Sequence, residues 1–162
     1  MISLHNKDGN GIWTELINTS GFVGQQGAGG TLETNRKTPR GTYGFSMAFG
    51  IKPNPGSLIT YTQVNDLHYW VDNPDSQYYN QFVSTDSVVP EWNSAEHLSS
   101  CAPAYNYALA LNYNSACVPG KGSAIFLHCS TGSPTYGCIA VPESAMKSLL
   151  QNITPGCAIV IK

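Results

Sequence analysis

Charged side chains are scarce in this chain of 162 residues, and neither sign dominates. Lysine and arginine together number 8 and aspartate and glutamate 10, so the formal net charge is −2. A protein that binds nucleic acid needs a basic surface to neutralise the phosphates. The sequence therefore predicts no nucleic-acid partner and favours ligands that are neutral or mildly polar.

Long hydrophobic runs are missing as well. The longest extends from Ser123 to Leu127, whereas a helix that spans a membrane needs about 20 apolar residues. The first residues, MISLHNKD, lack the apolar centre of an export signal. We therefore expect no membrane span in this chain. The abundant glycine, tyrosine, asparagine and serine are typical of extracellular β-rich domains, and an extracellular location would place the export signal outside these residues.

Cysteine pairs with the spacing of a metal site are absent too. The five cysteines include no C-x-x-C pair, and an odd number leaves at least one thiol free. Cys157 lies in an apolar terminal segment and is predicted to be a small buried hydrophobic residue. Cys101 and Cys117 could form a disulfide or merely pack, because the sequence does not fix the geometry that the bond requires.

The sequence does contain a series of strand patterns. Alternating or continuous apolar residues predict strands in six segments: 11–17, 38–50 (a turn entering a strand), 67–72, 105–113, 123–129 and 157–161. Alternation is strictest over 105–113, YNYALALNY. The segment 123–129, SAIFLHC, is apolar almost throughout, which is expected of a strand covered on both faces in the centre of a sheet.

One helix is indicated near the C-terminus. Pro142 suits the first turn, and apolar residues then recur on one face until TPG ends the helix. These residues are Ala145, Met146, Leu149, Leu150 and Ile153. No linker, repeat or low-complexity tract divides the sequence. We expect residues 1–162 to form one compact, mainly β domain with a single packed C-terminal helix.

The segment 122–141, GSAIFLHCSTGSPTYGCIAV, contains the candidate chemistry. His128 ends the predicted buried strand, a polar loop follows, and Gly137 and Cys138 open the next strand. Adjacent strands joined in this way would bring His128 and Cys138 side by side. An imidazole can take the proton of a neighbouring thiol, which lowers the pKa of the thiol and yields a nucleophilic thiolate. Gly137 would let backbone N–H groups turn toward the oxyanion of a tetrahedral intermediate.

Two other interpretations of these residues compete with a nucleophile. A histidine at a strand end and a cysteine in an apolar strand also suit plain packing. Zinc could be held by His128, Cys129 and Cys138, but adjacent residues of a strand point to opposite faces, so the first two could not easily ligate one ion. We therefore predict no metal.

Five blocks of the sequence, in this order, resemble the L,D-transpeptidase catalytic domain of the YkuD type, particularly its branch with a short interval between histidine and cysteine. They are TPRGTYGF, YWVDNPDSQYYN, YNYALALNYN, GKGSAIFLHC and PTYGCIAV. The most specific feature is the histidine followed at a distance by Ser/Thr-x-Gly-Cys, here His128 and residues 135–138. The likeness covers roughly residues 10 to 162 and implies a β-sandwich or barrel-like fold.

The resemblance also implies a role for each residue of this motif. Cys138 is the nucleophile, and His128 is the general base that later protonates the leaving amine. The carbonyl of Cys129 orients the imidazole. The backbone N–H groups of Tyr136, Gly137 and Cys138 form the oxyanion hole. Two consecutive acyl transfers require no cofactor, and we expect none.

The substrate implied by the family is a peptidoglycan stem tetrapeptide. The thiolate would attack the carbonyl of the third residue, a diamino acid, and D-alanine would leave. An amine of a neighbouring stem would then form a 3-3 cross-link, whereas water would make the same site an L,D-carboxypeptidase. We expect an enzyme that is extracellular or associated with the bacterial cell wall, and that carbapenems acylate.

The sequence departs from the family pattern at two positions. Many members carry a second histidine before Gly-Cys and an arginine or asparagine two places after the cysteine, where this chain has Tyr136 and Ala140. The missing cationic residue favours an alternative, a non-catalytic module that binds the cell wall. A thiol protease acting on L,L peptides is a third hypothesis, although the papain-type signature is absent.

The remaining candidates have weaker patterns. Trp70 could stack on a glycan or line the cleft, although an aromatic ring in a strand more often belongs to the core, and Thr135 is a further candidate for contact with substrate. Asp72 and Asn80 are expected to tie a loop together. His97 is expected to be exposed in a capped helical turn.

Overall fold

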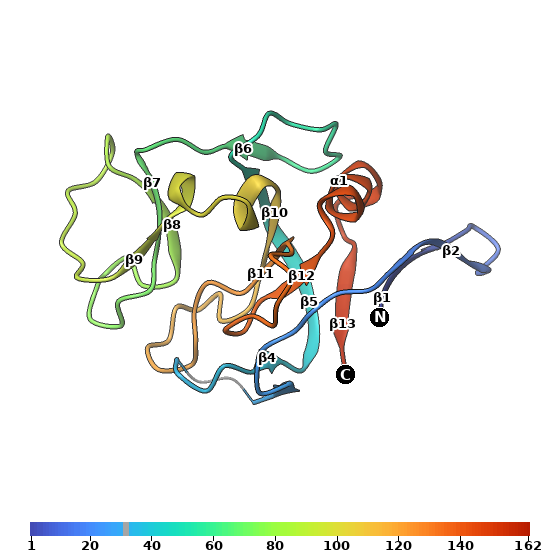
Figure 1. The fold of residues 1–162 in the computed structure, drawn as a ribbon, viewed down its shortest axis with the longest axis horizontal. Coiled ribbons are helices and arrows are strands. Elements are labelled where there is room, and N and C mark those ends of the chain that lie inside the picture. The colour runs from blue at the N-terminus through green and yellow to red at the C-terminus, as the bar shows by residue number, and fades with distance from the viewer. Residues whose placement is uncertain (31–32) are drawn as a thin grey trace.

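The computed structural model describes residues 1–30 and 33–162 (Figure 1). Its strands, its short 3-10 helices (η) and its α-helix are, in chain order, β1 Ile2–Lys7, β2 Trp13–Thr19, β3 Ala28–Gly29, β4 Thr38–Pro39, β5 Gly41–Gly50, β6 Tyr61–Gln63, β7 His68–Val71, β8 Gln81–Ser84, β9 Ala95–His97, η1 Leu98–Ser100, η2 Ala104–Asn106, β10 Ala108–Leu111, β11 Phe126–Cys129, β12 Ile139–Val141, α1 Glu143–Asn152 and β13 Ala158–Ile161.

A six-stranded sheet forms the centre of the molecule. Its order is β12-β11-β10-β5-β13, and β6 pairs with β5 as well. β11 pairs antiparallel with β10 and parallel with β12, so it is an interior strand. All four residues of β11 are buried. The prediction that 123–129 is a strand covered on both faces is confirmed, although the strand begins only at Phe126.

Two apolar clusters cover the two faces of this sheet. The first, which we call the helix-side cluster, contains Met146, Leu149 and Leu150 of α1. The second, the opposite cluster, contains Trp70 and Leu98 and lies toward the three-stranded sheet β8-β7-β9. Figure 1 shows α1 and this smaller sheet on either side of β10. The predicted class, mainly β with one packed C-terminal helix, is confirmed.

The strand predicted over 105–113 is shorter than expected. β10 covers Ala108–Leu111, whereas Tyr105 lies in η2. Leu109 packs in the helix-side cluster, and the two alanines of β10 pack in the opposite cluster. Both faces of β10 are covered, so all of its side chains are buried. The alternation in the sequence therefore places large side chains on one face and small ones on the other.

The C-terminal elements form as predicted. α1 begins directly after Pro142, and β13 then pairs antiparallel with β5. The apolar face of α1 is buried because the helix packs on the central sheet, with Met146 and Leu150 fully covered. Among the described residues, no helix has the length and apolarity needed to cross a membrane.

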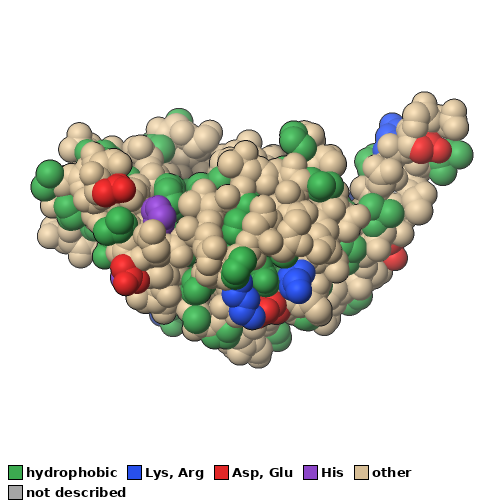
Figure 2. All heavy atoms as spheres, turned by 90° about the horizontal axis from the view of Figure 1, so that it is seen from above, with side chains coloured by type: hydrophobic (Ala, Val, Ile, Leu, Met, Phe, Trp, Pro, Cys, Tyr) green, Lys and Arg blue, Asp and Glu red, His purple; other side chains and the backbone are tan. Residues whose placement is uncertain are grey.

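The β1–β2 hairpin extends away from the body of the molecule (Figures 1 and 2). The strand predicted over 11–17 forms as β2. The alternation of apolar and polar residues in 11–17 leads one to expect a half-buried strand, but Trp13 is 63% exposed. The expectation was wrong because the outer part of β2 has only β1 as a neighbour, and no second layer covers it.

The five cysteines are all free thiols. Cys101 and Cys117 therefore pack without forming a disulfide. Cys157 is partly rather than fully buried, because it packs at the edge of the helix-side cluster.

Candidate active site

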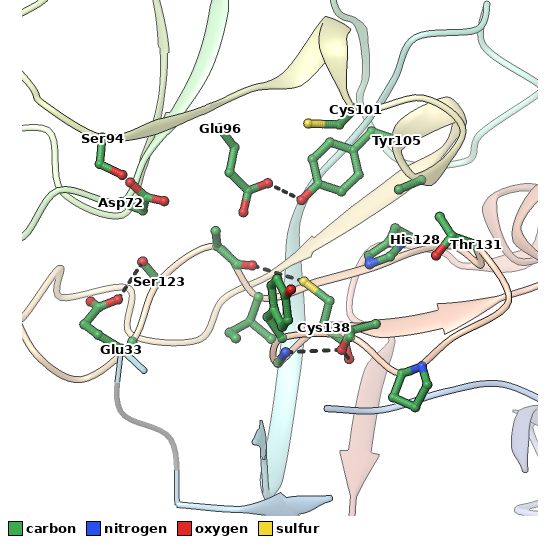
Figure 3. Close-up of a pocket in the computed structure, with 18 of the residues that line it drawn as sticks. Glu33, Asp72, Ser94, Glu96, Cys101, Tyr105, Ser123, His128, Thr131 and Cys138 are labelled. Atoms are coloured by element: carbon green, nitrogen blue, oxygen red, sulfur yellow. Dashed lines mark hydrogen bonds between the residues drawn. The ribbon is translucent and has the colours of Figure 1, made fainter. Parts of the chain in front are cut away.

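A cavity of about 780 Å³ opens where the loop between β11 and β12 meets the residues around η2. His128 and Cys138 line one side of it (Figure 3). Glu33, Asp72 and Glu96 line the other side. The cavity therefore collects residues from at least four segments that are distant in the sequence.

The pairing of β11 with β12 places His128 and Cys138 on the same face of the sheet. Leu127 pairs in parallel with Ile139, so Cys138 lies one strand away and level with Phe126. Because side chains alternate along a strand, His128 and Cys138 face the cavity while Leu127 and Ile139 enter the helix-side cluster. The same alternation sends the Cys129 side chain into that cluster, away from His128.

Two threonine hydroxyls hold the backbone of Cys138. The carbonyl of Cys138 accepts hydrogen bonds from Thr135 Oγ1 at 2.6 Å and from Thr38 Oγ1 at 3.2 Å. Thr135, predicted to contact substrate, does line the cavity, but this hydrogen bond uses its hydroxyl to fix the loop. Gly137 has φ of +153°, and a Cβ there would lie 3.3 Å from the Lys37 carbonyl oxygen. The loop therefore requires glycine at 137.

The Cys138 thiol is neutral in this resting site. Its Sγ donates a hydrogen bond to Ala124 O at 3.2 Å and accepts one from Phe126 N–H at 3.3 Å. Burial, together with the nearby charge of Glu96, raises the pKa of Cys138 to about 12, and the Phe126 N–H opposes the rise. The lowered pKa expected from the sequence is wrong for this state. No hydrogen bond joins His128 to Cys138 within the described ranges, so the imidazole does not offset the burial.

The imidazole of His128 is oriented by the carbonyl named in the sequence analysis. Its Nδ1 lies 2.8 Å from Cys129 O. Because a carbonyl only accepts, Nδ1 carries the hydrogen and Nε2 keeps its lone pair. Burial lowers the pKa of His128, so the ring is neutral at neutral pH. The ring of Tyr105 packs edge-on against it, with the ring centres 5.5 Å apart.

The three N–H groups predicted to form the oxyanion hole are not equivalent. The Gly137 N–H donates to Thr135 Oγ1 at 3.2 Å. The N–H groups of Tyr136 and Cys138 donate to no other group in the part of the chain that the structure describes. Two donors beside the thiol are therefore available to an oxygen of a ligand.

A comparison with protein families matches residues 3–161 to YkuD, described as the L,D-transpeptidase catalytic domain. The chain belongs to this family. The resemblance found in the sequence is thereby confirmed over nearly the whole chain, and the protein is an enzyme domain of the L,D-transpeptidase kind, a family that acts on peptidoglycan peptides. No curated protein and no solved structure matches it.

The structure shows what occupies positions 136 and 140, where this YkuD domain departs from the family pattern. Tyr136 is 74% exposed at the rim of the cavity, and the Arg36 guanidinium carbon lies 4.7 Å from its ring centre. A cationic group therefore reaches this rim from another segment. Ala140 is 1% exposed, and its backbone pairs with Phe22, so the N-terminal segment covers the position where many members have a larger polar residue.

Trp70 belongs to the core of the YkuD domain and does not line the cavity. It is 6% exposed, its ring meets Phe126 edge-on, and its indole N–H donates to Asn80 Oδ1 at 3.0 Å. Trp70 is therefore corrected from a candidate substrate contact to the alternative core position, because the smaller sheet packs this ring inward. Asn80 also accepts from Ala124 N–H and so ties two loops together, as expected.

Several residues that line the cavity were not singled out from the sequence as site residues, above all Glu96 and Tyr105. Glu96 lies in β9, opposite Trp70 of β7. Its neighbour His97, expected in a helical turn, ends this strand and stacks on Tyr69 with the ring centres 4.5 Å apart. No local pattern identifies Glu96, because its place in the cavity depends on the pairing of β7 with β9. Within residues 1–30 and 33–162, no group of three or more His, Cys, Asp or Glu side chains is arranged to hold a metal ion.

Proposed function

We propose that this YkuD domain is a cysteine-dependent L,D-transpeptidase of peptidoglycan, with Cys138 as nucleophile and His128 as general base. The donor is a stem tetrapeptide, attacked at the carbonyl of its third residue. One observation carries the proposal: the hydrogen bond between His128 Nδ1 and the Cys129 carbonyl leaves Nε2 able to accept a proton in the cavity that holds the thiol.

Acylation begins when Sγ leaves Ala124 O and passes its proton to His128 Nε2. Both groups are neutral in the empty site, so we infer that this transfer occurs together with attack on the substrate carbonyl. The free N–H groups of Tyr136 and Cys138 bind the developing oxyanion. The C–N bond then breaks, the proton on His128 goes to the departing D-alanine amine, and a thioester to Cys138 remains.

The acyl group is then transferred to a second nucleophile. An amine of a neighbouring stem attacks the thioester carbon, loses its proton through His128 to the Cys138 sulfur, and forms a 3-3 cross-link. Water in place of the amine releases a tripeptide, which is the L,D-carboxypeptidase reaction. Neither route uses a metal or a cofactor. We also propose that residues 1–162 act as one catalytic domain, and that it works outside the cell at the wall.

Incubation with a disaccharide tetrapeptide, followed by mass spectrometry, tests this proposal. We expect a thioester adduct and either dimer or tripeptide from the native protein, and loss of all three in Cys138→Ser. Cys117→Ser is the matched control, because Cys117 is a free thiol outside the cavity, and it keeps native turnover. Unchanged turnover in Cys138→Ser would overturn the mechanism.

A non-catalytic module that binds the cell wall is the second candidate. The hydrogen bond from Sγ to Ala124 O favours it, because the sulfur is occupied by a backbone carbonyl rather than by the imidazole. This candidate predicts sedimentation with purified sacculi but no adduct with tetrapeptide or with a carbapenem. A carbapenem adduct located on Cys138 would exclude it.

A further inference from the structure

The imidazole of His128 has a single polar restraint among the described residues. Its Nδ1 lies 2.8 Å from the carbonyl oxygen of Cys129, and its Nε2 has no hydrogen-bond partner there. The torsion that turns a histidine ring about its bond to Cβ has broad minima, so one hydrogen bond holds the ring only loosely. Packing must therefore hold the ring if Nε2 is to keep facing the cavity.

Tyr105 supplies this packing. The centres of the two rings lie 5.5 Å apart, and their planes are inclined by 75°. Both residues line the cavity, although Tyr105 is only 6% exposed. Figure 3 shows Tyr105 between Glu96 and His128. Because aromatic rings pack closely in this geometry, the Tyr105 ring limits the rotation of the imidazole.

Tyr105 is itself fixed at its backbone and at its ring. Its N–H donates to Cys101 O at 2.9 Å, and its carbonyl accepts from Ile51 N–H at 2.9 Å. Its ring meets the rings of Phe49 and Phe126 nearly at right angles, with the centres 5.7 and 5.5 Å apart. Tyr105 is therefore a rigid wall beside the imidazole.

The Tyr105 hydroxyl makes a contact that packing alone does not require. It donates a hydrogen bond to Oε2 of Glu96 in β9. Burial, together with the nearby Asp72, raises the pKa of Glu96 to about 7 against the opposing effect of this hydroxyl. A phenylalanine at 105 with an apolar residue at 96 would fill the same space without the cost of a buried acid. The pair is explained if it serves to fix the Tyr105 ring in one place.

We propose that Tyr105, anchored by Glu96, is a positioning residue that holds the His128 imidazole with Nε2 toward the cavity. The inference rests on the proposed function, in which Nε2 takes the proton of Cys138. Tyr105 and Glu96 act through the position of the imidazole, because the hydroxyl donates to Glu96 and not to His128. Misplacing a reacting group by about 1 Å can cost about 100-fold in rate.

Nitrogen NMR of the histidine side chains tests the position of the ring without requiring turnover. Such spectra distinguish the two neutral tautomers, and the His128 signals are those that His128→Gln lacks. In the native protein at about pH 8 we expect one tautomer, with the hydrogen on Nδ1. Tyr105→Leu should show a mixture of both tautomers, because the ring no longer stays beside the Cys129 carbonyl. A single, unchanged tautomer in Tyr105→Leu overturns the inference.

The rate of thioester formation with the tetrapeptide is the second readout. At saturating substrate we expect a fall of about 10- to 100-fold in Tyr105→Leu and of about tenfold in Glu96→Leu, with the half-saturating concentration nearly unchanged. Glu96→Gln keeps an acceptor for the hydroxyl and should recover most of the rate lost in Glu96→Leu. A native rate in Tyr105→Leu also overturns the inference.

Tyr79→Leu is the matched control. Tyr79 is a tyrosine that is 2% exposed and does not line the cavity. Its loss should lower the melting temperature, as the loss of Tyr105 does, but leave the tautomer and the rate native. The comparison separates a role at His128 from a general loss of packing.

Failure of the inference and failure of the proposed function give different results. A native protein that forms no thioester contradicts the proposed function, yet a tautomer that changes in Tyr105→Leu and not in Tyr79→Leu still supports the positioning role. If Tyr105→Leu does not fold, Tyr105→Phe and Glu96→Leu replace it. A fall in rate that Glu96→Gln recovers then supports the inference, and native rates in both replacements, or a fall that Glu96→Gln does not recover, overturn it.

Discussion

Cys138 and His128 are both kept in their neutral forms by burial. An apolar environment disfavours any charged form, so it raises the pKa of a thiol and lowers that of an imidazole. The pair can exchange a proton only when something compensates for the charges that form. In the proposed mechanism, the N–H groups of Tyr136 and Cys138, which have no partner among the described residues, would supply such compensation by binding the oxyanion of the substrate.

Alkylation of Cys138 by iodoacetamide should therefore be slow and steeply dependent on pH. While the pH stays far below the thiol pKa of about 12, the ionised fraction grows about tenfold per pH unit. We expect the rate at Cys138, followed by peptide mass mapping, to rise from pH 7 to pH 10 without a plateau. Cys117 serves as the internal comparison. A plateau below pH 9 would show that the empty site already stabilises the thiolate.

At the scale of elements, the loop that carries Cys138 depends on a segment from the N-terminal part of the sequence. Thr38 in β4 is fully buried, accepts from Gly24 N–H at 2.8 Å, and donates to Cys138 O. One hydroxyl thus links the β3–β4 region to Cys138, the proposed nucleophile. The sequence block TPRGTYGF carried the resemblance, but the contact of its first residue with Cys138 is a tertiary feature.

Replacement of Thr38 by valine should test this link. The side chain keeps its shape, but the buried Gly24 N–H loses its partner, which costs about 1–3 kcal/mol. We expect Thr38→Val to lower the melting temperature and to slow thioester formation, because the Cys138 carbonyl loses one of its two donors. Thr38→Ser keeps the hydroxyl and should recover most of both. Native behaviour of Thr38→Val in both measurements would contradict this role.

Elements with complete local signals were predicted well. α1, β11 and β13 each combine an apolar pattern with clear ends, and all three formed near the expected positions. The segment 105–113 was predicted less well, because its alternation reports side-chain size and not backbone geometry. Tyr105 turns into η2, where its hydroxyl reaches Glu96. No sequence pattern indicates this partner, because the contact depends on how β9 and η2 pack together.

At the scale of the whole molecule, few charges are present, and three acids meet in one cavity. Burying a carboxyl costs stability unless it is well paired. The groups that face Glu96 are Asp72, Tyr105, Cys101 and Cys138, and none of them is a cation. This arrangement destabilises the empty fold, as is typical of a site organised for binding rather than for stability.

The stability of Glu96→Gln relative to the native protein should depend on pH. The pKa of Glu96 is about 7 in the folded state against an ordinary 4.5. Between pH 4.5 and pH 7 the carboxyl is therefore ionised in the unfolded chain but still protonated in the folded protein, so the free energy of unfolding of the native protein falls as the pH rises. The gap corresponds to at most about 3 kcal/mol. Thermal melts should show the variant more stable than the native protein at pH 8, with the difference shrinking at pH 5. An equal difference at both pH values would contradict the buried acid.

The sequence by itself determined the strands and helix with strong local patterns, the family, and the candidate pair His128 and Cys138, because each of these is recorded in neighbouring residues. Only the tertiary structure decided that Trp70 belongs to the core and that Glu96 faces the cavity. It also decided that the thiol is protonated at rest. These properties depend on burial and on charges that strand pairing brings together from segments distant in the sequence. A local sequence pattern contains no information about which distant segments will pair.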